Sequence, residues 1–93
     1  MVVTVWIPSL MRDLTHGEHE VMVEARSVRE VVARLDVLFP GIAARLVNEN
    51  RLRPGLMLVV DGASSNEGLR YVLEPGSEVH FVPAMSGGIS LNP

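Results

Sequence analysis

The chain opens with residues that alternate between apolar and polar at the period of a β-strand. The apolar set is Val3, Val5 and Ile7, and the residues between them are Thr4 and Trp6. Alternation places the two sets on opposite faces of a strand, which we predict over residues 2–7. Pro8 ends this strand, because proline has no N–H to donate to a ladder. A second alternating stretch predicts a strand over residues 19–25, paired with the first as a hairpin.

A capping box marks the start of a helix. The hydroxyl of Ser27 can accept a hydrogen bond from the backbone N–H of Glu30, whose carboxylate can reach back to Ser27. The apolar residues that follow have the i, i+3, i+4, i+7 spacing of one buried stripe. They are Val28, Val31, Val32, Leu35 and Leu38. The helix is predicted to end at Phe39, because Pro40 disfavours helical backbone before it and Gly41 permits a sharp turn.

The middle of the chain predicts one more buried strand. A short helical turn is predicted over residues 42–47, followed by a polar loop over residues 48–55. Residues 56–60 are all apolar, which is typical of a strand buried on both faces, so we predict that this is the central strand. The dipeptide Asp61-Gly62 then turns the chain.

The last third predicts a loop, a short strand, a turn and a final strand. These elements are expected over residues 63–66, 69–72, 74–77 and 78–83, respectively. In the final strand Val79 and Phe81 point inward and His80 points outward. The whole order predicts an α+β fold in one domain, with a mixed sheet covered by one main helix.

Composition narrows the functional classes. Apolar residues make up 47% of the 93 residues and charged residues 20%, which is typical of a folded globular chain. The run at residues 56–60 is far shorter than the roughly 20 residues of a membrane span, and no basic segment of a signal peptide is present, so we expect a cytoplasmic protein. A chain of this size has little room for a deep cleft, so we expect no enzyme activity of its own.

The charged residues and the missing cysteines exclude further classes. Cysteine is absent, so disulfides, thiolate nucleophiles and cysteine-based metal sites are excluded. All eight basic residues are arginine, and the net charge is −3 without a basic run, so nucleic acid is not an expected partner. Without lysine, the chain could donate its own terminus to an isopeptide bond but offers no ε-amine as acceptor. Arg51 and Arg53 could pair with an acidic partner or remain solvated.

Three other side chains are candidates for chemistry or binding. His16 and His19 flank Gly17, and this spacing does not fit the helical His-Glu-x-x-His zinc motif, so we expect a solvated loop and no metal site. Trp6 has two possible positions. In the predicted register it lies on the outer face of the sheet, where a partner could dock, whereas a slip of one residue would bury it in the core.

Four motifs together resemble one known family. They are Ile7-Pro8, Phe39-Pro40-Gly41, the Val60-Asp61-Gly62 turn, and the closing run of residues 73–88, in which a Pro-Gly turn, a strand and Pro83-Ala84 precede Gly87-Gly88. Over residues 2–88 the chain resembles the MoaD/ThiS family of ubiquitin-like sulfur carriers, and is most similar to those of cysteine biosynthesis. The resemblance implies a β-grasp fold, with four to five strands packed on one main helix. It implies a domain over residues 1–84 and a flexible tail over residues 85–93.

The resemblance also implies a function for the diglycine. In this family an E1-like adenylyltransferase uses ATP and Mg²⁺ to activate the terminal carboxylate, and sulfur then displaces AMP to leave a thiocarboxylate on the last glycine, here Gly88. A sulfur-accepting synthase would consume it in the formation of cysteine, molybdopterin, thiazole or a specialised metabolite. The chain itself would bind no cofactor and act as a monomer. The implied docking residues are Trp6, Phe81, Pro83 and Met85.

The chain departs from the family pattern after the diglycine. Residues 89–93 follow Gly88, so this glycine carries a peptide bond and has no free carboxylate to adenylate. A metal-dependent peptidase that removes residues 89–93 would resolve the conflict. Two alternatives remain open: a ubiquitin-like modifier conjugated through Gly88, and a non-catalytic β-grasp interaction module that keeps its tail.

Overall fold

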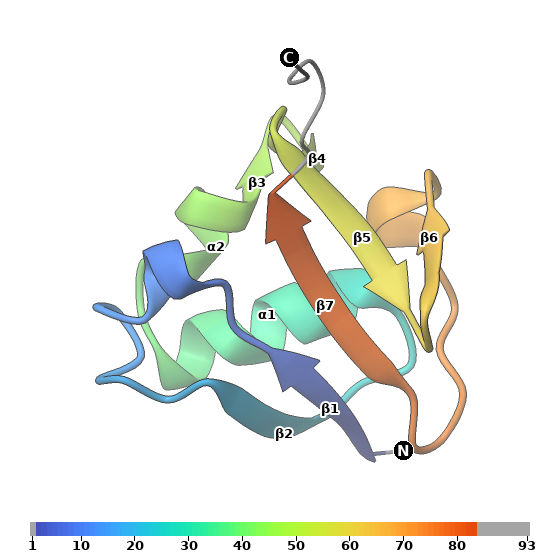
Figure 1. Cartoon of the computed structure of the whole chain (residues 1–93), viewed down its shortest axis with the longest axis horizontal. Coiled ribbons are helices and arrows are strands. Elements are labelled where there is room, and N and C mark those ends of the chain that lie inside the picture. The colour runs from blue at the N-terminus through green and yellow to red at the C-terminus, as the bar shows by residue number, and fades with distance from the viewer. Residues whose placement is uncertain (1, 84–93) are drawn as a thin grey trace, which may run out of the picture.

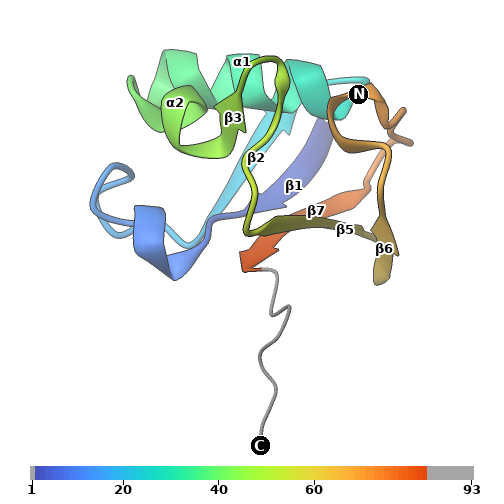
Figure 2. The same cartoon turned by 90° about the horizontal axis from the view of Figure 1, so that it is seen from above.

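Five strands form one mixed sheet, and both α-helices lie against the same face of it (Figures 1 and 2). The computed structural model describes residues 2–83. The strands are β1 (Val2–Trp6), β2 (Glu20–Glu24), β3 (Val47–Asn48), β4 (Arg51–Leu52), β5 (Leu56–Val60), β6 (Ala63–Ser65) and β7 (Glu78–Pro83). The helices are α1 (Val28–Leu38) and α2 (Ile42–Leu46), with single 3-10 turns at η1 (Ser9–Met11) and η2 (Gly68–Arg70). The predicted α+β class is confirmed.

The order of strands in the sheet is β2-β1-β7-β5-β6. β1 pairs antiparallel with β2, as predicted, and parallel with β7. β7 pairs antiparallel with β5 on its other side. The prediction that residues 56–60 form the central strand was therefore wrong, because β7 occupies the centre. The last strand in sequence is inserted between the first strand and β5, so the segment that leads to the diglycine leaves from the middle of the sheet.

The core lies between the sheet and α1. Val3, Val5, Val79 and Phe81 from the two middle strands are almost fully buried, together with Leu35 of the helix. The strand register is the one that the alternation predicts. The rest of the core comes from residues that share these two layers, including Val23, Val28, Val31, Val32, Ile42, Leu46, Leu58 and Val60.

Helix α1 begins and ends where the sequence indicates. Two other details of the prediction differ from the structure. Ser27 Oγ accepts from the backbone N–H of Glu30 at 3.2 Å, but the Glu30 carboxylate accepts from the N–H of Arg26 at 2.7 Å rather than from Ser27. Leu38, predicted to be part of the buried stripe, is 53% exposed. At about 100° per residue it lies at the edge of the stripe in the last turn, where it misses the core.

Ser27→Ala is expected to lower the free energy of unfolding by about 1 kcal/mol, because the N–H of Glu30 loses its side-chain acceptor. Urea unfolding followed by circular dichroism measures the change. Ser64→Ala is the matched control: Ser64 is exposed on β6 and its hydroxyl makes no hydrogen bond within residues 2–83, so a change below about 0.5 kcal/mol is expected. Equal effects of the two substitutions would show that the cap contributes nothing.

Residues 63–66, predicted to be a loop, contain strand β6. Asp61 and Gly62 both have positive φ, at 52° and 86°. Val60 pairs directly with Ala63, so these two residues form a tight hairpin. A two-residue turn forces pairing to resume at once, even though alanine and serine carry little strand propensity.

Residues 69–72, predicted to be a short edge strand, form the end of η2 and a connection instead. Leu69 is buried at 6% exposure whereas Val72 is 73% exposed. Val72 makes an isolated bridge to Ser27, and the N–H of Val28 donates to the carbonyl of Tyr71. The prediction was wrong because these residues begin in a 3-10 turn that packs against α1 and buries Leu69, and they do not pair as a strand in the sheet.

The predicted loop over residues 48–55 contains a small hairpin. β3 and β4 pair through Val47 with Leu52 and Asn48 with Arg51. Glu49 and Asn50 between them have φ of 53° and 65°. The predicted helical turn before it is confirmed as α2. No helix among the described residues has the length and apolar character needed to cross a membrane.

Candidate docking face and tail exit

Within residues 2–83, no helix covers the outer face of the sheet. Figure 2 shows α1 and α2 on one side of the strands only. The strand register aligns one row across this open face, consisting of Glu20, Trp6, His80, Val59 and Ser64. A second row joins Val82 to Met57, and Met57 is 38% exposed. An exposed sheet face with an aromatic and aliphatic centre is the kind of surface that binds another protein.

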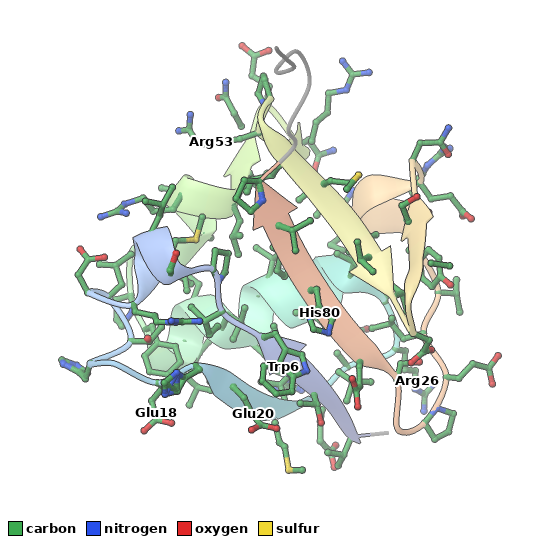
Figure 3. The ribbon with its side chains drawn as sticks, in the orientation of Figure 1. Trp6, Glu18, Glu20, Arg26, Arg53 and His80 are labelled. Carbon is green, nitrogen blue, oxygen red and sulfur yellow. The ribbon has the colours of Figure 1, made fainter. Side chains whose placement is uncertain are left out.

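Trp6 and His80 form the centre of this face. They are neighbours on the parallel strands β1 and β7. Their ring centroids are 5.4 Å apart with an interplanar angle of 8°, which is a stacked arrangement (Figure 3). His80 Nε2 lies 3.9 Å from Glu78 Oε1. The structure thus decides between the two positions of Trp6: the ring lies on the outer face, and His80 points outward as predicted.

The Trp6 indole has a polar atom without a partner. Its Nε1 is buried and makes no hydrogen bond within residues 2–83. A buried donor left unpaired destabilises by about 1–3 kcal/mol relative to a paired one. The Trp6 N–H therefore destabilises the described domain, and no acceptor within residues 2–83 offsets this.

The chain leaves the sheet at the end of β7. Pro83, the last described residue, is exposed and lies opposite Leu56 at the start of β5. Pro83 is thus placed where a partner can reach it. The other predicted site residues, Met85, Gly87 and Gly88, lie outside the described residues, as does the proposed tail over residues 85–93.

The corner around this exit is held by Arg53. Its Nε donates to the carbonyl of Ala44 at 2.7 Å, and its backbone N–H donates to the carbonyl of Leu46 at 2.9 Å. Its carbonyl accepts from the N–H of Leu56 at 3.1 Å. Arg53 therefore ties α2 to the start of β5. Arg53 is exposed, so its charge can still be solvated or meet an acidic partner, as the sequence analysis left open.

One predicted docking residue is in the wrong place for that role. Phe81 is 2% exposed and belongs to the core, so its ring offers no surface to a partner. Its neighbours on β7 follow the strand period: His80 and Val82 point outward, whereas Phe81 points toward α1. The prediction that Phe81 docks a partner is corrected accordingly.

Sequence reasoning missed Met57, Val59 and Val82 as members of the outer face. The signal was present in the all-apolar run of β5, which we interpreted as burial on both faces. A single main helix can cover only one face of a sheet. The second set of apolar residues in that run must then remain on the surface, and this is what the structure shows for Met57.

The histidines of the first loop stay apart from this face. His16 and His19 are both exposed in the segment between η1 and β2. Within residues 2–83 no group of three or more histidine, aspartate or glutamate side chains is arranged to hold a metal ion. The candidate site among the described residues is thus a docking face beside the end of β7.

Comparison with known families decides the identity. The model of the ThiS family matches residues 5–88, and the match ends at the second glycine. The chain belongs to the ThiS family. The resemblance to MoaD/ThiS sulfur carriers with a β-grasp fold is therefore confirmed, and proteins of this family are generally not catalysts. Residues 89–93 lie beyond the family match.

Solved structures support this assignment. A chain from the crystal structure of the Amycolatopsis orientalis BexX/CysO complex is 32% identical, with a TM-score of 0.84 over 92% of this chain and 99% of that chain. Mycobacterium tuberculosis CysO is 26% identical, with a TM-score of 0.81 over 89% and 99% of the two chains. SAMP1 from Haloferax volcanii, at 17% identity, a TM-score of 0.75 and coverage of 95% and 100%, shares the fold. No curated protein matches the chain.

Proposed function

We propose that this ThiS-family chain carries sulfur as a thiocarboxylate on Gly88 after residues 89–93 have been removed. The single observation that carries the proposal is the family match that runs through the diglycine and stops there. Gly88 follows Pro83 by five residues, an extended span of at most about 17 Å. That length lets the glycine reach a recessed active site while the domain stays docked. Glycines also suit a narrow channel, because they have no Cβ.

The chemistry would take place on a partner. The Gly88 carboxylate attacks the α-phosphate of ATP on an E1-like enzyme, which gives an acyl-adenylate and releases pyrophosphate. The sulfur of a hydrosulfide ion then attacks the acyl carbon, the bond to AMP breaks, and the thiocarboxylate remains on Gly88. The thiocarboxylate is consumed by a sulfur-accepting synthase. Mg²⁺ and ATP belong to the activating enzyme in this scheme.

The outer face provides the docking surface in this proposal. Trp6 and Val59 give it an apolar centre, and Pro83 marks the side from which the tail departs. Among the similar structures, the Amycolatopsis orientalis CysO is found in a complex with BexX. We infer that the present chain likewise meets its enzymes as a docked body with an inserted tail.

Processing should act as an all-or-none switch. We expect a chain ended at Gly88 to release pyrophosphate when incubated with its activating enzyme and ATP, because it has a free carboxylate. Added sulfide should then raise its intact mass by the replacement of one oxygen by sulfur. The chain that retains residues 89–93 is the control and should give neither signal. A Gly88-ended chain that forms no acyl-adenylate with any cognate activating enzyme would refute the carrier proposal.

A second function uses the same terminus. The fold is shared with the SAMP1 modifiers, and a Gly88-ended chain could be joined to lysines of other proteins. This alternative predicts stable conjugates of increased mass in cell lysates, whereas a sulfur donor leaves none. The absence of lysine means that such conjugates would contain a single copy of this chain at each site.

A further inference from the structure

Strand β2 lies at one edge of the sheet, and within residues 2–83 its only strand neighbour is β1. The N–H of Ile7 donates to the carbonyl of His19, whereas the N–H of Thr4 donates to that of Ser77, on the β7 side of β1. A strand bonds to one neighbour through every second residue. The odd-numbered residues of β1 and β2 therefore bond to each other, and the even-numbered residues of β2 direct their N–H and C=O groups away from the sheet.

The even-numbered residues of β2 are Glu20, Met22 and Glu24. Their backbone groups make no hydrogen bond within residues 2–83. All three residues are exposed, Met22 to 67%, and Figure 1 shows the free side of β2. An edge of this kind can bind an extended peptide by strand addition, in which main-chain hydrogen bonds give the affinity.

An open apolar hollow of about 450 Å³ lies beside this edge. Its apolar wall comes from Val21 and Met22 of β2 and from Leu38 and Phe39 at the end of α1. Leu38 is 53% exposed, so it has apolar surface that the described domain does not cover. The side chains of an added strand alternate between the two faces of the sheet. Every second one would point to the α1 side, where the hollow can take an apolar side chain.

The carboxylates beside the edge determine the charge of the segment that fits it. Glu18, Glu20 and Glu24 are exposed and form no ion pair within residues 2–83. Glu18 and Glu20 lie on the outer side of β2 in Figure 3. No arginine occurs between Arg12 and Arg26, so the strand has no positive side chain of its own. A basic segment is therefore complementary to this edge.

We propose that the edge of β2 binds an extended segment of a partner protein in which basic and apolar residues alternate. Residues opposed on neighbouring strands share a face, so the basic side chains lie on the outer face beside Glu20 and Glu24. Oppositely charged residues directly across two strands stabilise their pairing. The apolar side chains point the other way, toward the hollow at Leu38.

A second copy of the chain fits this edge poorly. Antiparallel pairing of two β2 strands about Met22 would set Glu20 of one copy against Glu24 of the other, and like charges in that position are destabilising. The charges thus favour a basic partner over self-association. The inference goes beyond the proposed function, since it rests on residues 2–83 and holds whether or not Gly88 carries sulfur.

The test uses the full chain labelled with nitrogen-15 and the peptide acetyl-Lys-Val-Lys-Val-Lys-Val-Lys-amide as probe. At a peptide concentration ten times its Kd, exchange of the Glu20, Met22 and Glu24 amide protons with water should slow about tenfold, because strand addition gives them acceptors. Ser64 on the opposite edge strand is the internal reference. Its N–H makes no hydrogen bond within residues 2–83, and its exchange should change by less than about twofold.

The double variant E20Q/E24Q tests the charges. It should weaken binding of the probe about fivefold, because two cross-strand charge pairs are lost, and binding to the unchanged protein should weaken as salt is raised. The matched control is E67Q/E74Q, which removes the same charge from two exposed positions away from β2. It should change the Kd by less than about twofold.

Leu38→Ala tests the hollow and should weaken binding about fivefold, because the apolar side chain of the probe loses its contact. Val37→Ala is the matched control: Val37 is 77% exposed, is the preceding residue on α1 and does not line the hollow. It should change the Kd by less than about twofold. All of these substitutions are at exposed positions, and the nitrogen-15 spectrum reports whether each variant is folded.

Four outcomes would overturn the proposal. They are unchanged amide exchange along β2 in the bound state, equal weakening by the two carboxylate double variants, equal effects of Leu38→Ala and Val37→Ala, and no binding of the probe up to about a millimolar. The last of these would mean that the carboxylates of β2 only keep the edge apart from other strands.

Discussion

Phe81→Ala is expected to lower the free energy of unfolding by about 3–5 kcal/mol, the largest stability effect that we predict for a single substitution in this chain. The ring is 2% exposed at the centre of β7, with Val79 on the same face and α1 above it. Truncation removes the apolar contacts and leaves a cavity that the two layers cannot close. Urea unfolding at equilibrium measures the change. If the variant does not fold, Phe81→Leu should show a smaller loss of the same sign.

Val82→Ala is the matched control for this prediction. Val82 is the next residue on β7 but points to the outer face and is only partly buried. Its truncation should lower the free energy of unfolding by about 1 kcal/mol or less. A larger loss for Val82→Ala than for Phe81→Ala would mean that the faces of β7 are exchanged, and the assignment of the docking face would be wrong with them.

Trp6→Ala, in a chain ended at Gly88, should raise the KM of the activating enzyme for this carrier about thirtyfold. Tryptophan at the centre of an interface contributes about 2 kcal/mol or more to binding, and a loss of 2 kcal/mol corresponds to that factor. Trp6 is stacked on His80 in the middle of the uncovered sheet face, so a docked enzyme would bury both rings. Pyrophosphate release at varied carrier concentration gives KM and kcat separately, and kcat should change little because the tail is intact.

Val37→Ala provides the control on the opposite side of the molecule. Val37 is 77% exposed on α1 and is equally apolar, but it lies on the helical layer and not on the sheet face. It should leave KM within about twofold. If Val37→Ala raised KM as much as Trp6→Ala, the enzyme would dock on the helices. A Trp6→Ala chain with unchanged KM would remove the sheet face from the docking proposal altogether.

Local patterns were sufficient for most of the elements. Alternation located β1, β2 and β7 and gave the correct inward faces for β1 and β7, and Ser27 and Pro40 placed the ends of α1. These signals act within a few residues, so they do not depend on what the element packs against. The predictions failed where the local signal was weak or misleading. Residues 63–66 were predicted as a loop because alanine and serine carry little strand propensity, and residues 69–72 were predicted as a strand although they begin in the 3-10 turn η2.

For the candidate site, too, some properties follow from the sequence and others only from the tertiary structure. The sequence by itself was sufficient to predict Gly87-Gly88 as the reactive end, because the closing run of motifs is a property of the chain alone, and the family model matches the chain as far as Gly88. Only the tertiary structure decided that Trp6 stacks on His80 and that Phe81 is buried. These facts depend on β7 lying between β1 and β5. The tertiary structure also brings Arg29, Arg51 and Arg70 to one groove. Pairing between strands far apart in sequence is set by the packing of the whole sheet on its helix, which no local pattern records.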